Sequence, residues 1–302
     1  MESKLRWALV TAIAPIAWGS TYYVTQEWLP ADYPLWGGVI RALPAGILML
    51  LLVRTLPSGS WWWKSLVLGT LNVGAFFVLI YIAAQLLPSS IATVLMATSP
   101  VAMMVLAWAI ISERPHILSA VGAVLGFIGV SAMLLTGGDA IDPVGVVTAL
   151  TAMLMSAVGY VLTKKWAKDV AVVPLTAWQL TAGGLVIVPF ALVFEGGPPL
   201  LGATEVAAFA YIAIFATAIA YWAWFSGLKH LDAGAVGLIG LLNPLVGVLL
   251  GTLVAAEILS VVQVVGIAIV LLGIVIGQPF VLRLMERRGD RHRARELSHP
   301  TG

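Results

Sequence analysis

"LPSSIATVLMATSPVAMMVLAWAIISERPHILSAVGAVLGFIGV", residues 87–130, decides the fold, because a second stretch of the chain repeats its pattern. That second stretch, "LDAGAVGLIGLLNPLVGVLLGTLVAAEILSVVQVVGIAIVLLGI" at residues 231–274, aligns with it without gaps. The matched residues stand 144 positions apart (for example 244 less 100): Leu87 with Leu231, Pro100 with Pro244, Glu113 with Glu257, Gly122 with Gly266, and Gly129 with Gly273. A fainter match upstream pairs the stretch from Pro34 with the stretch from Pro174. The chain therefore contains an internal repeat.

The composition places this repeat in a membrane. Of 302 residues, 61% are hydrophobic and only 10% are charged, whereas soluble domains are about one quarter charged. Uncharged apolar runs of about twenty residues recur along the chain, which is typical of membrane-spanning helices. Cysteine is absent, which excludes disulfides, thiolate catalysis and cysteine metal sites. We therefore expect an all-α integral membrane protein.

Breaks at Pro, Gly and charged residues predict ten transmembrane helices. Their expected ranges are 5–26, 33–54, 61–86, 88–111, 116–136, 143–164, 172–194, 204–228, 232–256 and 258–282. Fifteen of the 16 Lys and Arg residues fall at one set of helix ends or in the tail, and the sixteenth is Arg41. Because basic residues concentrate in cytoplasmic loops, both termini are expected in the cytoplasm.

Five spans in each half is an odd number, so the second half should enter the membrane upside down relative to the first. Residues 1–138 form the first expected repeat, residues 139–282 the second, and residues 283–302 a basic cytoplasmic tail. Such a tail fits an anionic lipid surface better than a nucleic acid. Secondary transporters use a 5+5 inverted repeat of this kind, with the binding site between the halves near the bilayer midplane.

The motifs also resemble a known family. "AWGSTYYV" in the first span, "RALPAGILMLLL" in the second, and "SERP" followed by spaced glycines are similar to the EamA branch of the drug/metabolite transporter superfamily. Within that branch the chain looks most like exporters of aromatic amino acids. The resemblance implies a basket of ten helices around a central cavity. It also implies that the first, third, fourth, sixth, eighth and ninth helices line the cavity, with the fifth and tenth packed behind.

Several residue types at mid-span predict contacts with a substrate. Each proline frees the carbonyl one turn before it, and buried amides and aromatic rings suit a small amphipathic molecule. The candidate substrate-binding residues are Trp18, Tyr22, Asn72, Phe76, Met96, Pro100, Tyr160, Tyr221, Trp222, Asn243 and Pro244. Each residue type also has a structural alternative. The rings pack against neighbouring helices, groups within the protein satisfy the carbonyls that the prolines free, and Asn72 joins two helices.

Arg41 is the one charged residue well inside a span, and an intramembrane charge is a functional hypothesis by default. Because the resemblance implies that the second helix lies outside the main cavity wall, Arg41 is expected to be a structural partner for freed carbonyls or part of a gate rather than a substrate ligand. Gly122, Gly126 and Gly129 predict close helix packing.

The sequence thus predicts an exporter of small amphipathic metabolites, above all amino acids including aromatic ones, working by alternating access in the cell's inner (plasma) membrane. Export of drug-like cations is the alternative on the same fold. An intramembrane enzyme is disfavoured because no nucleophile–base pair or metal motif lies at span depth. No cofactor, metal or nucleic-acid partner is expected; the partners are a small-molecule substrate and the lipid bilayer. The oligomeric state stays open, and a monomer is compatible with the sequence.

Overall fold

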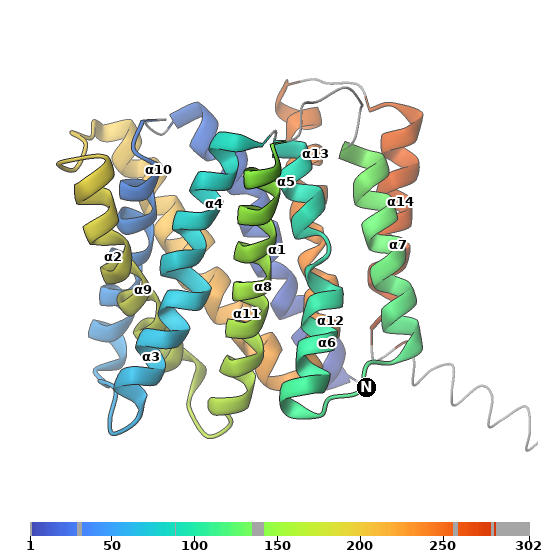
Figure 1. Cartoon of the computed structure of the whole chain (residues 1–302), viewed down its shortest axis with the longest axis horizontal. Coiled ribbons are helices and arrows are strands. Elements are labelled where there is room, and N and C mark those ends of the chain that lie inside the picture. Colours follow the sequence, from blue (N-terminus) through green and yellow to red (C-terminus); the bar gives the residue numbers. More distant parts are fainter. Residues whose placement is uncertain are drawn as a thin grey trace, which may run out of the picture.

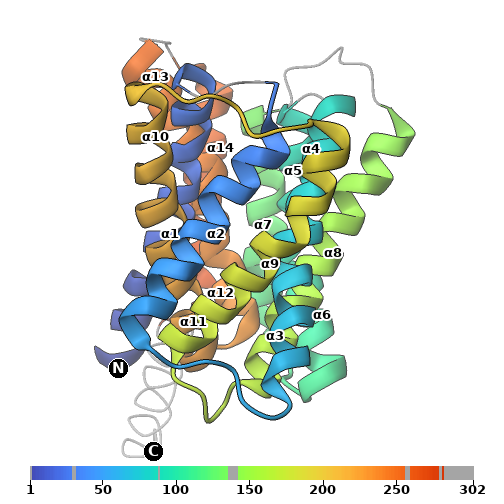
Figure 2. The ribbon, with the colours of Figure 1, turned by 90° about the vertical axis from the view of Figure 1, so that its left-hand side faces the viewer.

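Long helices running between two ends make up the computed structural model (Figures 1 and 2). The structure describes residues 2–28, 32–87, 89–134, 142–255, 259–278 and 281. These residues form helices and the turns between them, without a strand among the described segments. The expected all-α class is therefore confirmed. Glu257 and the expected tail, residues 283–302, lie outside the described residues.

The first half contains seven α-helices and a π-helical turn. Their bounds are α1 (Glu2–Trp28), α2 (Pro34–Val53), α3 (Trp61–Gly69), η1 (Thr70–Gly74), α4 (Ala75–Leu86), α5 (Ser89–Met96), α6 (Ser99–Ile111) and α7 (Ile117–Leu134). The π-helical turn η1 joins α3 to α4 without a loop, so residues 61–86 form one apolar span.

The second half follows the same order of elements, ending in α14. Its elements are α8 (Pro143–Trp166), α9 (Val172–Phe194), α10 (Ala203–Ala213), η2 (Ile214–Ile219), α11 (Ala220–His230), α12 (Ala233–Gly240), α13 (Leu242–Ala255) and α14 (Val261–Ile276). Capping hydrogen bonds fix where α8 and α14 begin. Asp142 Oδ1 accepts from the backbone N–H groups of Val144 and Gly145, and Ser260 and Gln263 form a capping box.

Eight helices within the described residues are long and apolar enough to cross a membrane. They are 34–53, 61–86, 91–111, 117–134, 143–166, 172–194, 203–230 and 233–250. α14 is apolar but only 16 residues long, about 24 Å at 1.5 Å per residue, against a hydrocarbon core of about 30 Å. α1 mixes Trp, Tyr, Thr and Ser with its apolar residues, which lowers its hydropathy. The chain is thus a multi-pass membrane protein.

The expected mid-helix kink at Pro100 takes another form. α5 ends at Met96, Ala97 and Thr98 form a turn, and α6 begins at Ser99. Pro100 therefore occupies the first turn of a new helix, where its missing N–H has no partner to lose. The same interruption occurs at Leu241, between α12 and α13, so Pro244 also stands in a first turn. The physical reason is that breaking the helix relieves the clash that a proline causes in an unbroken one.

Glycines set the distance between two of the packed helices. α7 and α14 lie side by side at one edge of the molecule (Figure 1). A Cβ at Gly129 would stand 2.7 Å from the carbonyl oxygen of Gly266, and one at Gly122 would strike the backbone of Gly273. Since these glycines let the two backbones touch, the expectation of close helix packing is confirmed.

Two tryptophans tie α2 to α9, which run next to each other in Figure 2. Trp36 Nε1 donates to the Gly196 carbonyl at 3.0 Å, just beyond the end of α9. Trp178 Nε1 donates to the Thr55 carbonyl at 2.8 Å, just beyond the end of α2. Each helix therefore satisfies a backbone oxygen at the end of the other, which leaves fewer polar groups facing lipid.

A methyl group at Gly129 should disrupt the α7–α14 contact. We expect Gly129→Ala to lower the free energy of unfolding by about 1–3 kcal/mol, because the added Cβ overpacks a backbone-to-backbone contact. Gly197→Ala is the matched control, since nothing lies within 4 Å of a Cβ there. Thermal unfolding of both variants in detergent measures the difference. Equal stability would show that α7 and α14 do not need the close approach.

Candidate functional site

A cavity of about 290 Å³ lies among the helices of both halves. This volume is close to the lower end of the range for small-molecule pockets, roughly 300–1,000 Å³. Its lining comes from α1, α2, α4, the interrupted α5–α6, α8, α11 and the interrupted α12–α13. The lining residues are Trp18, Thr21, Arg41, Phe76, Phe77, Ile80, Thr93, Met96, Ala97, Ser99, Met103, Ser156, Ala157, Tyr160, Tyr221, Trp224, Gly240, Leu241, Asn243 and Pro244.

Four rings from three helices form one aromatic wall of this cavity. The Trp18 ring lies 5.4 Å from Tyr221 and 5.3 Å from Trp224, centroid to centroid. Tyr160 lies 5.4 Å from Trp224, at an interplanar angle of 59°. These tilted and edge-to-face arrangements are the ones that aromatic pairs prefer. They give the wall a fixed shape and leave ring surface for a flat apolar molecule.

The π-helical turns supply backbone oxygens to this wall. The Tyr221 hydroxyl donates to the carbonyl of Asn72, inside η1, at 3.0 Å. Trp18 Nε1 donates to the carbonyl of Ala216, inside η2, at 3.1 Å. A π-helical turn shifts the backbone ladder locally, and such turns are frequent at functional sites. In this molecule they make acceptors available to side chains from the opposite half.

Arg41 reaches the cavity from α2. Its Nε donates to Thr217 Oγ1 and its Nη2 donates to the Ala216 carbonyl, both at 3.1 Å. The guanidinium carbon lies 4.8 Å from the centre of the Phe77 ring, within the range of a cation–π contact. The residue is half-buried and lines the cavity. It therefore does serve a backbone carbonyl, as expected, but it also faces the site, which the sequence did not predict for α2.

Two polar atoms at the cavity have no hydrogen-bond partner within the described structure. They are Trp224 Nε1, a donor, and Asn243 Oδ1, an acceptor. Both are buried, and Asn243 sits in the first turn of α13, next to the helix interruption. A buried polar atom without a partner costs roughly 1–3 kcal/mol. These atoms are accordingly positions where a bound molecule would gain hydrogen bonds.

Seven of the eleven predicted binding residues line the cavity. They are Trp18, Phe76, Met96, Tyr160, Tyr221, Asn243 and Pro244. Phe76 and Phe77 lie 5.8 Å apart on α4 and cover its side of the space. The structure thus brings together residues that are more than 200 positions apart in the sequence.

Three predicted residues lie elsewhere, and the side chain of Tyr22 is outside the described part. Asn72 is fully buried beside the cavity, and its Nδ2 donates to Gln179 Oε1 at 2.7 Å and to Thr163 Oγ1 at 3.2 Å. The helix–helix contact considered as its alternative is the role that these bonds support. Pro100 is buried and contacts Gly237 of α12. Trp222 packs against the hydrophobic core that contains Tyr221 and Trp224, without lining the cavity.

The sequence reasoning missed Trp224 and the polar residues Thr21, Thr93, Ser99 and Ser156. Trp224 lies one turn after Tyr221, so the spacing of aromatic residues on one helix face is a signal that points to it. The small hydroxyl residues carry no comparable signal, because Ser and Thr often bond to their own helix.

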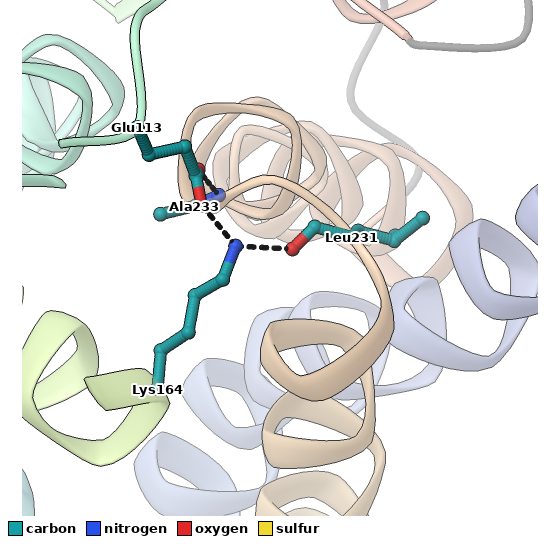
Figure 3. Close-up of polar contacts among 4 residues, drawn as sticks. All are labelled: Glu113, Lys164, Leu231 and Ala233. Carbon is teal, nitrogen blue, oxygen red and sulfur yellow. Dashed lines mark hydrogen bonds and ion pairs between the residues drawn. The ribbon is translucent and has the colours of Figure 1, made fainter. Parts of the chain in front are cut away.

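An ion pair joins the ends of α6 and α8 to the start of α12 (Figure 3). It lies at the end of the molecule that holds the N-terminus (Figure 1). Lys164, near the end of α8, pairs with Glu113, which follows α6, and its Nζ also donates to the Leu231 carbonyl at 2.7 Å. The second Glu113 oxygen accepts the backbone N–H of Ala233, the first residue of α12. A carboxylate at a helix N-terminus satisfies an orphan N–H and complements the helix dipole.

Three of the cavity-lining residues lie far from this ion pair along their helices. Thr21 is near the far end of α1, Arg41 is in the second turn of α2, and Thr93 is in the first turns of α5. All three helix ends lie opposite the end that holds the N-terminus in Figure 1. The cavity therefore extends toward the end of the molecule opposite the ion pair.

Metal binding has no support among the described residues, where no group of three or more His, Asp or Glu side chains comes together.

Comparisons with known proteins identify relatives over nearly the whole chain. A model of the EamA-like transporter family matches twice, at residues 5–135 and 143–276. The chain is 39% identical over 271 residues to protein PecM of Dickeya dadantii, covering 89% of this chain and 91% of that protein. It is 27% identical to the uncharacterized inner membrane transporter YedA of Escherichia coli, covering 86% and 87%.

One solved crystal structure has the same fold. It superposes with a TM-score of 0.81 and covers 93% of this chain and 99% of that one, at 18% sequence identity.

Removing the cation of the ion pair should destabilise the molecule. Lys164→Gln leaves the Glu113 carboxylate without its cation and the Leu231 carbonyl without its donor, so we expect a loss of about 1 kcal/mol of unfolding free energy. Lys168→Gln, at an exposed position one turn beyond, is the control. Thermal unfolding at low salt compares them, and a Lys164→Gln protein as stable as the control would contradict the assigned role.

Proposed function

The chain belongs to the EamA-like transporter family, and from that premise we propose that it exports small amphipathic metabolites, above all amino acids including aromatic ones, by alternating access around the central cavity. Because the family and the named relatives are transporters, the expectation that the chain is not an enzyme is confirmed. The family membership also confirms the resemblance seen in the sequence, at the level of the EamA branch.

The observation that carries the substrate proposal is the pairing of ring surface with buried polar atoms. The wall formed by Trp18, Tyr160, Tyr221 and Trp224 suits an apolar or aromatic side chain. Trp224 Nε1 and Asn243 Oδ1 suit the polar end of the same molecule. Sites of this composition, mostly apolar with few polar groups, are typical of small-molecule pockets.

The proposal includes ten spans arranged as a 5+5 inverted repeat, with repeats at residues 1–138 and 139–282. Three features support it. The family model matches once in each half. The π-helical turns begin at Thr70 and Ile214, 144 positions apart (214 less 70). In the α7–α14 contact Gly122 faces Gly273 and Gly129 faces Gly266, which is the exchange of partners that a pseudo-twofold axis produces.

We propose that the termini face the cytoplasm of a cell bounded by an inner membrane. The start of α1 lies at one end of the molecule, together with the loops that follow α2, α6, α8 and α11 (Figure 1). These segments and the helix turns next to them hold the described Lys and Arg residues apart from Arg41. Basic loops are typical of the cytoplasmic side. The printed description of YedA as an inner membrane transporter supports the membrane assignment.

In this orientation the Glu113–Lys164 pair holds the cytoplasmic end closed. Its partners come from α6 and α8 and from the turn before α12, so it joins the two halves. Alternating access would break this contact and close the opposite end. Inverted repeats achieve such an exchange by rocking one half against the other.

Transport by the purified protein tests the proposal. In liposomes loaded with unlabelled amino acid, we expect accumulation of labelled tryptophan and phenylalanine above that of protein-free vesicles. Trp18→Ala should reduce uptake at least tenfold, because it removes a ring and the hydrogen bond to Ala216. Trp62→Ala, at an exposed site far from the cavity, should not. Flux of a lipophilic cation with no flux of any amino acid would contradict the proposal.

A further inference from the structure

The interrupted helices of the two halves pack against each other in opposite directions. α6 and α12 are in contact. A Cβ at Gly237 would stand 3.0 Å from the Cα of Pro100, and one at Gly234 would meet the side chain of Met104. Residue numbers therefore rise along α12 as they fall along α6, so the two helices are antiparallel.

This register brings the two interruptions to the same level. α12 ends at Gly240, one turn beyond Gly237, and the register places Ala97 opposite Gly240, in the turn between α5 and α6. Ala97 and Leu241 belong to the same buried hydrophobic cluster. In Figure 1, α5 comes from the end of the molecule opposite the N-terminus and α12 from the end that holds it. The ends of these two short helices therefore meet in the interior.

Each interruption lacks one hydrogen-bond donor, because the helix that follows it carries a proline in its first turn. In an unbroken helix the N–H groups at positions 100 and 244 would bond the carbonyls of Met96 and Gly240, but proline has no N–H. Met96 and Gly240 both line the cavity, and Gly240 has only backbone atoms to present there. The cavity therefore has backbone acceptors at this level whose helical donor is missing.

Asn243 adds a side-chain acceptor at the same level. Its Oδ1 is buried at the cavity and has no hydrogen-bond partner among the described residues. Asn243 stands three positions after Gly240, across the interruption at Leu241. The Trp224 ring borders this backbone, because its Cη2 lies 3.2 Å from the position of a Cβ at Gly240. Acceptors in excess of donors, beside an aromatic wall, call for a ligand that donates hydrogen bonds.

We propose that the acceptors at the paired interruptions form an amine subsite of the transport cavity, in which Asn243 Oδ1 and the neighbouring backbone carbonyls bind the N–H groups of a primary amine on the substrate. A primary ammonium group carries three N–H donors. Helix C-terminal ends carry partial negative charge, and the interrupted helices of transporters use such ends to hold cations. This inference rests on the proposed transport function and narrows it to substrates with a primary amine. It disfavours quaternary drug-like cations, which have no N–H to donate.

No acidic side chain among the described lining residues helps to hold the amine. None of them is Asp or Glu, and Arg41, whose charge opposes a cation, also lines the cavity. Binding therefore depends on directional hydrogen bonds rather than on attraction to a negative side chain. The subsite should accordingly distinguish ligands by their N–H groups and not by their net charge.

Binding measurements on the purified protein in nanodiscs test the subsite. Tryptophan is compared with indole-3-propionate, which lacks the amine, and with its own trimethyl betaine, which keeps the positive charge but has no N–H on that nitrogen. We expect tryptophan to bind at least tenfold more tightly than either, because only its amine donates to the acceptors at the interruptions. Phenethylamine should likewise bind at least tenfold more tightly than phenethyltrimethylammonium.

Variants locate the acceptors. The readout is the amine preference, defined as the affinity for tryptophan divided by the affinity for indole-3-propionate. Asn243→Leu removes the orphan acceptor and should lower this preference at least threefold, whereas Asn243→Asp keeps an acceptor oxygen and should retain it. Pro244→Ala restores the N–H that bonds the Gly240 carbonyl in a helix, so it should lower the preference too. Pro189→Ala, at an exposed position inside α9 and outside the cavity lining, is the matched control and should keep the preference of the wild type.

The possible failures are distinguishable. Equal binding of tryptophan and indole-3-propionate by the wild type would overturn the subsite, and so would an equal loss of both ligands in Asn243→Leu, which is the mark of a purely structural role. Absence of binding by every primary amine in the panel would overturn it too. Amine-selective binding without flux in liposomes would support the subsite and overturn the transport function. The comparison of ligands on the wild type stands even if Asn243→Leu does not fold.

Discussion

The need to satisfy every backbone polar group inside a membrane is the constraint on which this structure depends. Lipid offers no hydrogen bond, so an interrupted helix is tolerated only where protein or a cavity receives its freed groups. The chain interrupts its helices at 97–98 and at Leu241, and shifts its ladder in η1 and η2. All of these sites surround or adjoin the cavity, and the helices α7 and α14, packed at the edge, are continuous over their described lengths.

The groups that satisfy the irregular backbone are the same groups that line the site. Tyr221 of the second half bonds the Asn72 carbonyl in η1, and Trp18 and Arg41 of the first half bond the Ala216 carbonyl in η2. Binding and stability therefore share residues, and each half completes the other. A movement of one half against the other must break or slide these cross-contacts, which is how occupancy of the cavity would be coupled to its opening.

Much of the fold follows from the sequence alone. Hydropathy, the repeat and the spaced glycines predicted helical spans, disturbed helices at the paired prolines and close helix packing at the glycines of α7, and seven of the eleven candidate residues line the cavity. What sequence spacing could not give is the rotation of each helix about its axis. Trp222 and Trp224 lie within one turn of each other on α11, yet only Trp224 lines the cavity, because at about 100° per residue their side chains point about 200° apart. A proline likewise indicates that a helix is disturbed without distinguishing a kink from a new start.

The role of Asn72 is defined by its hydrogen-bond partners Thr163 and Gln179, which lie 91 and 107 residues away in the sequence, so spacing along the chain does not reveal it. That Arg41 lines the cavity was not predicted, because the resemblance implied that its helix lies outside the cavity wall.

The most direct test of the central claim uses the absence of cysteine from the chain. Ser99→Cys introduces a single thiol at a cavity-lining position beside the α5–α6 interruption. A membrane-impermeant thiol reagent is applied separately to right-side-out and inside-out vesicles, with and without tryptophan. One cavity that opens to each side in turn predicts labelling from both faces and slower labelling when tryptophan is present. Labelling from one face only, unaffected by tryptophan, would contradict the account.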